Sequence, residues 1–245
     1  MKILVCLGQV PDTTSKISFT DNNTKLNPAG VQFIIGPYDE YALSKAIDLR
    51  EASGGSVTVF NVGLADAEPI IRKSLAIGAD DAVRVDADPA DALFVATQIA
   101  EYAKDKGFDM ILMGRESIDY NGGLVHGMVG EMLGIPSISP AMKLELEGNK
   151  AIISREIEGG KEVLEVPLPF VAGCQEPIAE WKIPNMRGIM SAKSKPLVVI
   201  PAIPVSNSVN HSAYELPAGR TSCKMIDAGN VDELVRLLKN EAKVI

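Results

Sequence analysis

The first half of the chain alternates short apolar runs with longer segments in which apolar residues recur every three or four positions. The short runs are continuous and rich in branched side chains, which is typical of strands that are covered on both faces. They are Ile3–Leu7, Val57–Val62, Ala82–Val85 and Met110–Met113. This alternation of strand and helix patterns predicts a parallel α/β sheet with right-handed crossovers.

The longer segments predict the crossover helices. The first helix is expected over Pro37–Ala52, and the third over Ala92–Lys106. In the second helix, Asp66 is the expected N-cap and Gly78 is the glycine expected to end the helix. One interruption precedes the first helix, because the segment Lys16–Asn27 places turn-forming residues between two short extended pieces and therefore predicts a hairpin.

The texture of the sequence changes after Pro136. Apolar and polar residues alternate over positions 142–169, with turn signals at Gly148 and Gly159, which predicts an antiparallel meander. Phe170–Cys174 is expected to return to the sheet as a strand. The segment 175–196 has no regular pattern, and the long polar segment 201–229 is expected to be functional or ordered by a partner. A last helix is predicted over Val231–Lys243.

Charge and composition exclude several classes of function. The chain of 245 residues has a formal net charge of −8, so a nucleic-acid partner is not expected. The basic stretch Ser191–Lys195 is expected to be a solvated face. No apolar run approaches the length of a membrane span, so no membrane insertion is expected. Three widely separated cysteines suit a reducing, cytoplasmic location, and two histidines are too few for a histidine-rich metal centre.

Candidate chemistry lies where the predicted strands end. In an open parallel sheet, ligands bind beyond the carboxyl ends of the strands, where the strand order reverses. Four polar or glycine-bearing stretches meet this condition or open the first helix, and we expect them to converge on one crevice. They are "GQVPDTT" from Gly8, "GPYDE" from Gly36, "NVGLAD" from Asn61 and "GRESIDYNGG" from Gly114.

The glycine pair Gly122–Gly123 precedes a predicted helix over Leu124–Leu133. Free backbone amides at a helix start favour an anion, and glycine allows a phosphate to approach closely, so this turn suits the phosphate of a nucleotide. The alternative is that the glycines only shape a turn. His126 suits a phosphate contact or a solvated or packed position. We expect Asp12, Asp39 and Asp119 to serve as helix caps or to contact a ribose.

Four stretches together resemble the beta subunit of electron transfer flavoprotein. They are "KILVCLGQVPDTTSKI", "NPAGVQFIIGPYDEYALSKAIDL", "IRKSLAIGADDAVRV" continuing to "LMGRESID", and "REIEGG…VPLPFVAGCQEP…IPNMRGIMSAKSKPL". The resemblance covers Met1 to about Leu197. It implies an adenine-nucleotide alpha-hydrolase-like (Rossmann-like) fold and a heterodimer with an alpha subunit. It also implies electron transfer from flavin-dependent dehydrogenases to an acceptor oxidoreductase.

The resemblance further implies that FAD is held mainly by the alpha subunit and that the beta subunit binds AMP, or a second FAD in members that bifurcate electrons. The residues implied for this nucleotide are Cys6, Gly36, Pro37, Asp39, Val62, Gly114, Arg115, Ser117, Asp119, Gly122, Gly123, Leu124 and Val125. Tyr38 and Thr13 are implied near the partner's flavin. A docking loop for dehydrogenases is implied with Ile183, Met186, Ile189 and Met190.

The chain departs from the family pattern at the phosphate turn. Many AMP-binding members have N-Q-T where this chain has Gly123, Leu124 and Val125, and the D-T-x-Q-V-G of bifurcating members is also missing. Contacts from backbone amides remain, which favours AMP and leaves FAD or an empty site as the alternatives. Two other readings are a stand-alone adenine-nucleotide sensor of the stress-protein type and, with less support, a nucleotidyl transferase or ligase.

The domain organisation expected from these observations has two parts. Residues 1–200 form a nucleotide-binding α/β domain that includes the meander (136–174) and the partner-recognition loop (175–195). Residues 201–245 form a C-terminal extension with a helix that contacts the partner subunit. We expect no catalytic residue and no metal site, because an electron carrier subunit needs no nucleophile, general base or metal cluster of its own.

Overall fold

The computed structural model describes residues 1–219 and 222–245. The chain divides into two compact units. Unit 1 comprises residues 1–17 and 27–212, and unit 2 comprises residues 18–26 and 213–245. Each unit is described by itself.

Within the described residues, unit 1 is organised around a single sheet of nine strands in the order β11-β10-β9-β12-β8-β1-β6-β7-β13. Strands β12, β8, β1, β6, β7 and β13 pair in parallel, whereas β9, β10 and β11 form an antiparallel meander. Their bounds are β1 Lys2–Cys6, β6 Ser56–Gly63, β7 Asp81–Asp86, β8 Met110–Gly114, β9 Ser137–Glu147, β10 Lys150–Ile157, β11 Gly160–Pro167, β12 Phe170–Cys174 and β13 Leu197–Pro201. The predicted mainly parallel α/β fold with a meander is therefore confirmed.

The order of the parallel strands reverses beside β1. Strands β6 and β7 follow β1 on one side, but the next strand, β8, pairs with the opposite side of β1. The carboxyl ends of β1 and β8 thus flank the point where ligands of such sheets bind.

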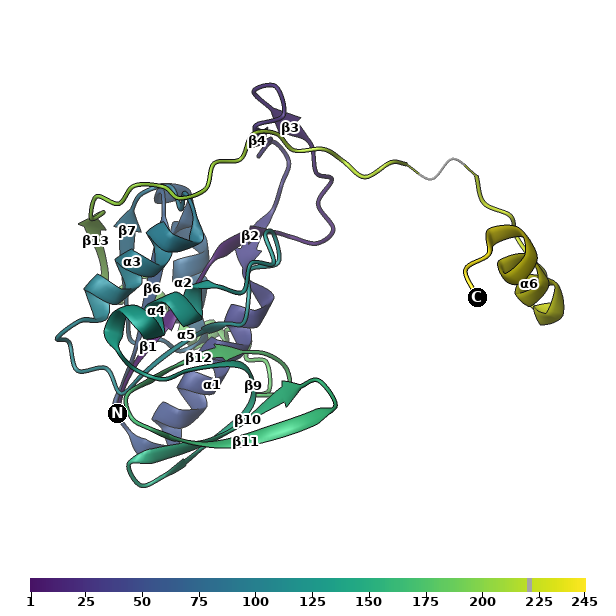
Figure 1. Cartoon of the computed structure of the whole chain (residues 1–245). Coiled ribbons are helices and arrows are strands. Elements are labelled where there is room, and N and C mark those ends of the chain that lie inside the picture. Colours follow the sequence, from purple (N-terminus) through teal and green to yellow (C-terminus); the bar gives the residue numbers. More distant parts are fainter. Residues whose placement is uncertain (220–221) are drawn as a thin grey trace. The chain divides into compact units, whose positions relative to one another are not determined.

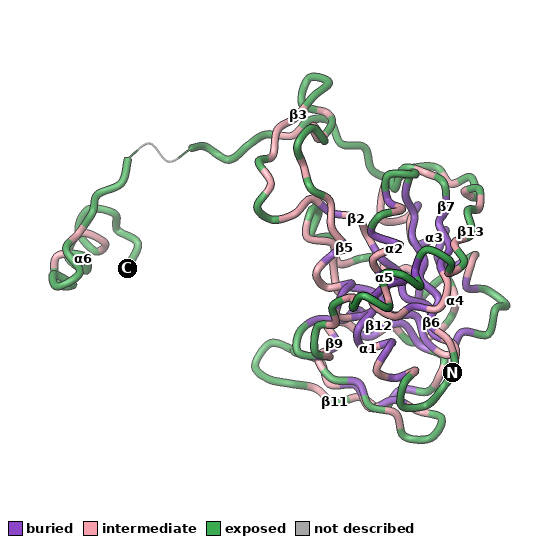
Figure 2. Tube along the Cα trace, turned by 180° about the vertical axis from the view of Figure 1, so that it is seen from behind, coloured by how far each residue is buried: buried purple, intermediate pink, exposed green. Residues whose placement is uncertain are grey.

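Helices cover both faces of the sheet (Figures 1 and 2). One face packs against α1 (Pro37–Ser53), α2 (Glu68–Ile77) and α5 (Met186–Ala192), and the other packs against α3 (Ala92–Ala103) and α4 (Val125–Leu133). The helices and the sheet enclose one hydrophobic core on each face of the sheet. In strand β1, Ile3 and Val5 belong to the core on the first face, whereas Leu4 and Cys6 belong to the core on the second. Its side chains alternate between two buried faces, as in other parallel strands.

Small elements complete unit 1. Strands β2 (Gln9–Pro11) and β5 (Phe33–Ile35) form a two-stranded antiparallel sheet between β1 and α1. A short 3-10 turn, η1 (Ala65–Ala67), precedes α2.

Four local predictions were wrong or incomplete. Asp66 lies inside η1 and does not cap α2, whose N-cap is Ala67. Helix α3 ends at Ala103, because the backbone leaves the helical region at Lys104. The segment 175–196 contains α5, which Asn185 caps by accepting a hydrogen bond from the N–H of Gly188 (2.8 Å). Strand β13 was missed, since a five-residue edge strand with exposed valines has no alternating pattern.

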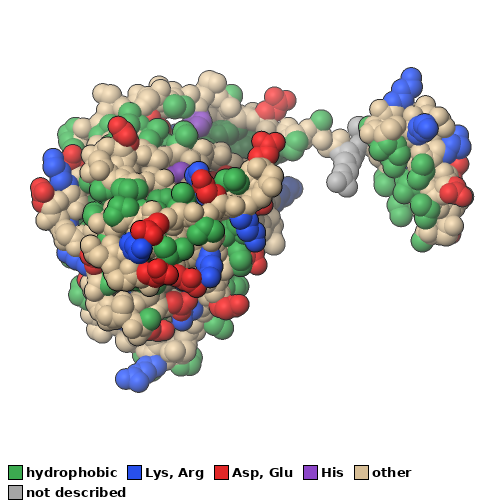
Figure 3. Space-filling model, turned by 60° about the horizontal axis from the view of Figure 1, so that its bottom comes forward, with side chains coloured by type: hydrophobic (Ala, Val, Ile, Leu, Met, Phe, Trp, Pro, Cys, Tyr) green, Lys and Arg blue, Asp and Glu red, His purple; other side chains and the backbone are tan. Residues whose placement is uncertain are grey.

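Unit 2 contains the predicted hairpin, β3 (Phe19–Thr20) and β4 (Lys25–Leu26). The Phe19 and Tyr214 rings stack with centroids 5.2 Å apart, and the N–H of Tyr214 donates to the carbonyl of Asn23. The C-terminal helix α6 (Val231–Leu237) continues as a π-helical turn, η2 (Leu238–Ala242). Figure 3 shows hydrophobic side chains gathered along one side of this helix. Val231, Leu234 and Val235 of α6 are exposed.

None of the helices in residues 1–219 and 222–245 is both long enough and apolar enough to cross a membrane.

Candidate functional site

A cavity of about 490 Å³ lies at the carboxyl edge of the sheet, at the point where the strand order reverses. All four stretches that the sequence analysis selected contribute to its wall, including Gly8, Asp39, Val62 and Gly114. Its size falls in the range of small-molecule sites. Much of the wall is apolar, formed by Leu7, Phe60, Val62, Val95, Ile99, Met113 and Val125.

The carboxylate of Asp39 holds the floor of this cavity together. Its two oxygens accept hydrogen bonds from the backbone N–H groups of Gly8 (2.8 Å) and Gly114 (2.7 Å). These glycines follow β1 and end β8, so one side chain from the first turn of α1 joins both strand ends. A Cβ on Gly114 would lie 2.7 Å from an Asp39 oxygen, and therefore only glycine fits there.

Burial gives Asp39 an unusual acidity. Its pKa is raised to about 7, mainly because burial removes hydration. The hydrogen bonds from Gly8 and Gly114 act in the opposite direction, and the negative charges of Asp119 and Glu40 add to the increase. Two buried thiols are near this charge: burial, and then Asp39, raises the pKa of Cys6 well above its usual range and that of Cys174 to about 12. Both thiols are buried and neutral at physiological pH.

The turn that ends at Gly123 leads directly into α4 along the cavity wall. Gly123 has a positive φ of 58°, which favours glycine, and no side chain in the described residues caps the first turn of α4. The free amides of this turn therefore remain available to an anion. The His126 ring packs toward β9, where its Nδ1 lies 3.4 Å from the Ser137 hydroxyl. Burial lowers its pKa, so His126 is neutral here.

Arg115 extends the site from the end of β8 toward β12. Its Nη1 donates to Gln175 Oε1 (3.0 Å), its Nη2 pairs with Glu116 (2.8 Å), and its guanidinium lies 4.9 Å from the centre of the Tyr38 ring. The Arg115 Nε is buried and has no hydrogen-bond partner in the part of the chain that the structure describes. This side chain is thus a fixed cation beside an aromatic ring.

One wall of the cavity was missed by the sequence analysis. The loop between β7 and α3, residues 88–91, lines it together with Val209 and His211. Asp91 caps α3 with one oxygen, accepting from the N–H of Phe94, and accepts from the N–H groups of Ser208 and Val209 with the other. The rule used for the other strand ends would have found the loop after β7. The segment around Val209 carries no such signal.

The structure brings most of the expected nucleotide residues to the cavity and places the others nearby or elsewhere. Those in its wall are Cys6, Asp39, Val62, Gly114, Arg115, Ser117, Asp119, Gly122, Gly123, Leu124 and Val125. Gly36, Pro37 and Tyr38 lie at the start of α1 beside Asp39 but are not among the lining residues, and Thr13 is exposed after β2. The expected docking residues Ile183, Met186, Ile189 and Met190 are exposed around α5, away from the cavity.

An open, mainly parallel α/β sheet with a nucleotide-sized cavity at its switch point defines the class of Rossmann-like nucleotide-binding folds. A family model described as "Electron transfer flavoprotein domain" matches residues 24–205. The "Electron transfer flavoprotein subunit beta" of Bacillus subtilis (strain 168) is 35% identical over the whole of both chains, and that of Syntrophomonas wolfei subsp. wolfei is 36% identical over 100% of this chain and 98% of its own. The chain belongs to the electron transfer flavoprotein beta-subunit family.

A relative with a different printed name is the "Acryloyl-CoA reductase electron transfer subunit gamma" of Anaerotignum propionicum. It is 33% identical over 82% of this chain and 77% of its own. The family assignment decides against the stand-alone sensor and against the transferase or ligase. It makes the chain an electron carrier subunit that works with an alpha subunit.

Proposed function

We propose that this beta subunit binds AMP in the cavity at the carboxyl edge of its sheet. In this proposal it covers one side of an FAD held mainly by the alpha subunit, and the complex carries electrons from flavin-dependent dehydrogenases to an acceptor oxidoreductase. The observation that carries the proposal is the junction of β1, β8 and α4 at one cavity, with free amides at one end and apolar walls beside them.

The residues present fit an adenylate. Apolar side chains such as Phe60, Val62 and Ile99 suit the faces of a purine. The carboxylates of Asp119 and Asp66 suit ribose hydroxyls, which can donate hydrogen bonds to them. The phosphate is expected at the amides around Gly123, because the start of α4 has no side-chain cap and its backbone N–H groups favour an anion. AMP would supply no chemistry to electron transfer and would stiffen the subunit.

The surface beside Arg115 is our candidate for the contact with the partner's flavin. Tyr38 lies under the Arg115 guanidinium, and Gln175 holds that guanidinium in place. Flavin supplies the one-electron and two-electron chemistry when it is bound, while the protein tunes its potential through nearby charge. In this proposal Arg115 provides a fixed positive charge, Tyr38 an aromatic surface, and Thr13 an exposed hydroxyl.

Two further surfaces suit protein partners. We propose that the exposed apolar residues around α5, with Ile183 as the expected anchor, dock to dehydrogenases. Methionine and isoleucine at such a surface adapt to partners of different shape. We also propose that the extension 201–245, with the exposed apolar side of α6, contacts the alpha subunit.

The nucleotide content of the assembled complex tests this proposal. The chain is co-expressed with an electron transfer flavoprotein alpha subunit, the complex is purified and denatured, and the released nucleotides are separated and quantified. One FAD and one AMP per pair is the expected result. Two FADs would instead indicate a bifurcating form, and a complex with FAD but no nucleotide in the beta subunit would refute the assignment of the cavity.

A further inference from the structure

Helix α5 is built with two unlike sides. Met186, Ile189 and Met190 follow a helical spacing and are exposed, the two methionines by more than 70%. On the other side Ala192 is buried, and a Cβ on Gly188 would lie 2.2 Å from the carbonyl oxygen of Ala76 in α2. The backbone of α5 is therefore pressed directly against α2, and its apolar residues point away from the protein.

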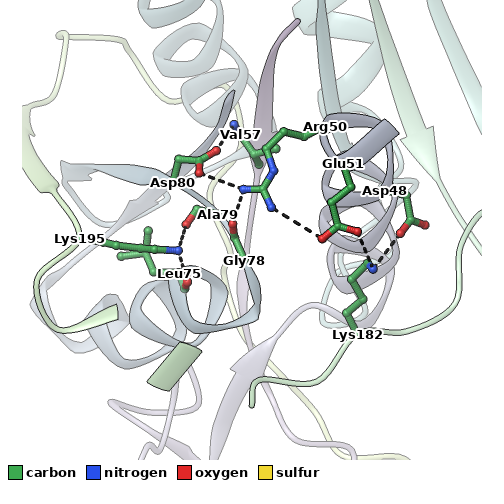
Figure 4. A network of polar contacts seen from close by, with 10 residues as sticks. All are labelled: Asp48, Arg50, Glu51, Val57, Leu75, Gly78, Ala79, Asp80, Lys182 and Lys195. Atoms are coloured by element: carbon green, nitrogen blue, oxygen red, sulfur yellow. Dashed lines mark hydrogen bonds and ion pairs between the residues drawn. The ribbon is translucent and has the colours of Figure 1, made fainter. Parts of the chain in front are cut away.

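A lysine that follows α5 fastens this packing. The Lys195 ammonium donates to the carbonyl oxygens of Leu75 (2.9 Å) and Ala79 (2.5 Å), at the end of α2 (Figure 4). Leu75 lies in the last turn of α2 and Ala79 directly follows its C-cap Gly78, so both carbonyls are at the negative end of the helix, where a cation is stabilised. The expectation that residues 191–195 form a solvated face is thus wrong for Lys195, which lies partly buried against the protein.

An arginine of α2 makes the reciprocal contact. Arg72 Nη1 donates to the carbonyl oxygens of Ala192 (2.9 Å) and Lys195 (2.8 Å), at the end of α5. Each of the two segments thus supplies a cation for free carbonyls of the other. Four side chain–backbone bonds close around the same short stretch, residues 192–195.

The beginning of the loop is held as well. The backbone N–H of Lys182 donates to the hydroxyl of Ser44, and its ammonium pairs with Asp48 (2.9 Å) and Glu51 (3.6 Å) of α1 (Figure 4). Between Lys182 and Lys195 the chain carries the exposed apolar residues. The loop is therefore attached at both ends, and its outer surface is left without side chains of this chain packed over it in the described residues.

We propose that Lys195 and Arg72 are positioning residues that hold α5 on the protein, so that Met186, Ile189 and Met190 form a rigid docking surface for a dehydrogenase. This inference rests on the proposed function of the loop and goes beyond it by assigning roles to residues that contact no partner. A surface fixed before binding loses less conformational entropy on docking, so the two cations strengthen association without touching the dehydrogenase.

The test uses the co-purified complex with the alpha subunit and the substitution Lys195→Met, which keeps an unbranched side chain as long as the aliphatic part of lysine and removes the ammonium. The dehydrogenase used is one that reduces the wild-type complex, followed by flavin absorbance. We expect a rise of about fivefold to tenfold in the KM for the carrier, because the equivalent of about one backbone residue regains its freedom. The kcat and the bound nucleotides should not change, and amide exchange over residues 186–194 should accelerate.

Three further variants separate positioning from other effects. Arg72→Met should reproduce the result from the opposite side of the contact, and Gly188→Ala should do so by displacing α5 from Ala76. Lys193→Met removes an exposed charge from the same loop, and it should leave amide exchange over residues 186–194 unchanged.

The outcomes decide the inference separately from the proposed function. An equal rise in KM for Lys193→Met and Lys195→Met would assign the effect to surface charge and overturn the inference. Unchanged amide exchange in Lys195→Met would also overturn it. If no flavin-dependent dehydrogenase reduces the wild-type complex, the proposed function of the loop fails, while amide exchange still decides whether Lys195 holds α5.

Discussion

The buried carboxylate of Asp39 makes a quantitative prediction about stability. Asp39→Asn replaces a group whose two oxygens accept two backbone hydrogen bonds with one that has a single acceptor. One N–H, of Gly8 or of Gly114, then loses its partner, which costs about 1–3 kcal/mol relative to the ionised carboxylate. The pH dependence of stability is the more informative quantity, because asparagine does not titrate and the variant therefore lacks the contribution of this position.

The sign of the pH dependence follows from the raised pKa of Asp39. Its pKa is about 7 in the folded protein and 3.8 in its ordinary state, so between these values the folded protein holds a proton that the unfolded chain has released. The free energy of unfolding consequently falls as the pH rises through this window. From pH 5 to pH 8 the contribution of this residue falls by about 2.5 kcal/mol, at about 1.4 kcal/mol per pKa unit.

The assay is urea unfolding of the co-purified complex at one protein concentration, measured from pH 5 to pH 8. The difference in unfolding free energy between the wild type and Asp39→Asn should shift by about 2.5 kcal/mol in favour of the variant as the pH rises. Asp105→Asn, at an exposed position outside the cavity wall, is the matched control. Parallel curves for the wild type and Asp39→Asn would show that Asp39 does not titrate in this range and would refute the reasoning.

Three other substitutions test the site and the core. Gly123→Glu places a carboxylate at a backbone position with positive φ in the proposed phosphate turn, so the affinity for AMP should fall at least about tenfold. Gly148→Glu in the meander introduces similar backbone strain and should keep its nucleotide. Equal retention of AMP in both variants would contradict the assignment of the turn. Leu43→Ala in the fully buried face of α1 should destabilise the protein by about 2–5 kcal/mol, measured by urea unfolding. Asp91→Ala removes the cap of α3 and should cost about 1 kcal/mol, with faster amide exchange at Val209, and unchanged exchange there would argue against this contact.

The sequence was informative where one local rule decides the structure. The four apolar runs became β1, β6, β7 and β8, because a strand buried on both faces cannot carry polar side chains without burying them. The hairpin and the meander were also found, since their turns need glycine, asparagine or aspartate at positive φ, as at Asn23 and Gly148. Helix α5 and β13 were missed, because both depend on contacts with distant segments: α5 on α2, and β13 on its pairing with β7.

The same division explains what could be predicted of the site. Glycines and polar residues at strand ends mark the cavity, because the geometry of a parallel sheet brings those ends together. The clamp made by Asp39 could not be read from the chain, since it joins residues that are 31 and 75 positions away from it. The raised pKa of Asp39 arises mainly from that burial, to which the charges of Asp119 and Glu40 add. Asp39, which the sequence analysis expected to cap a helix or contact a ribose, therefore also connects the ends of β1 and β8. A nucleotide that binds in the cavity contacts a floor whose charge depends on pH near neutrality.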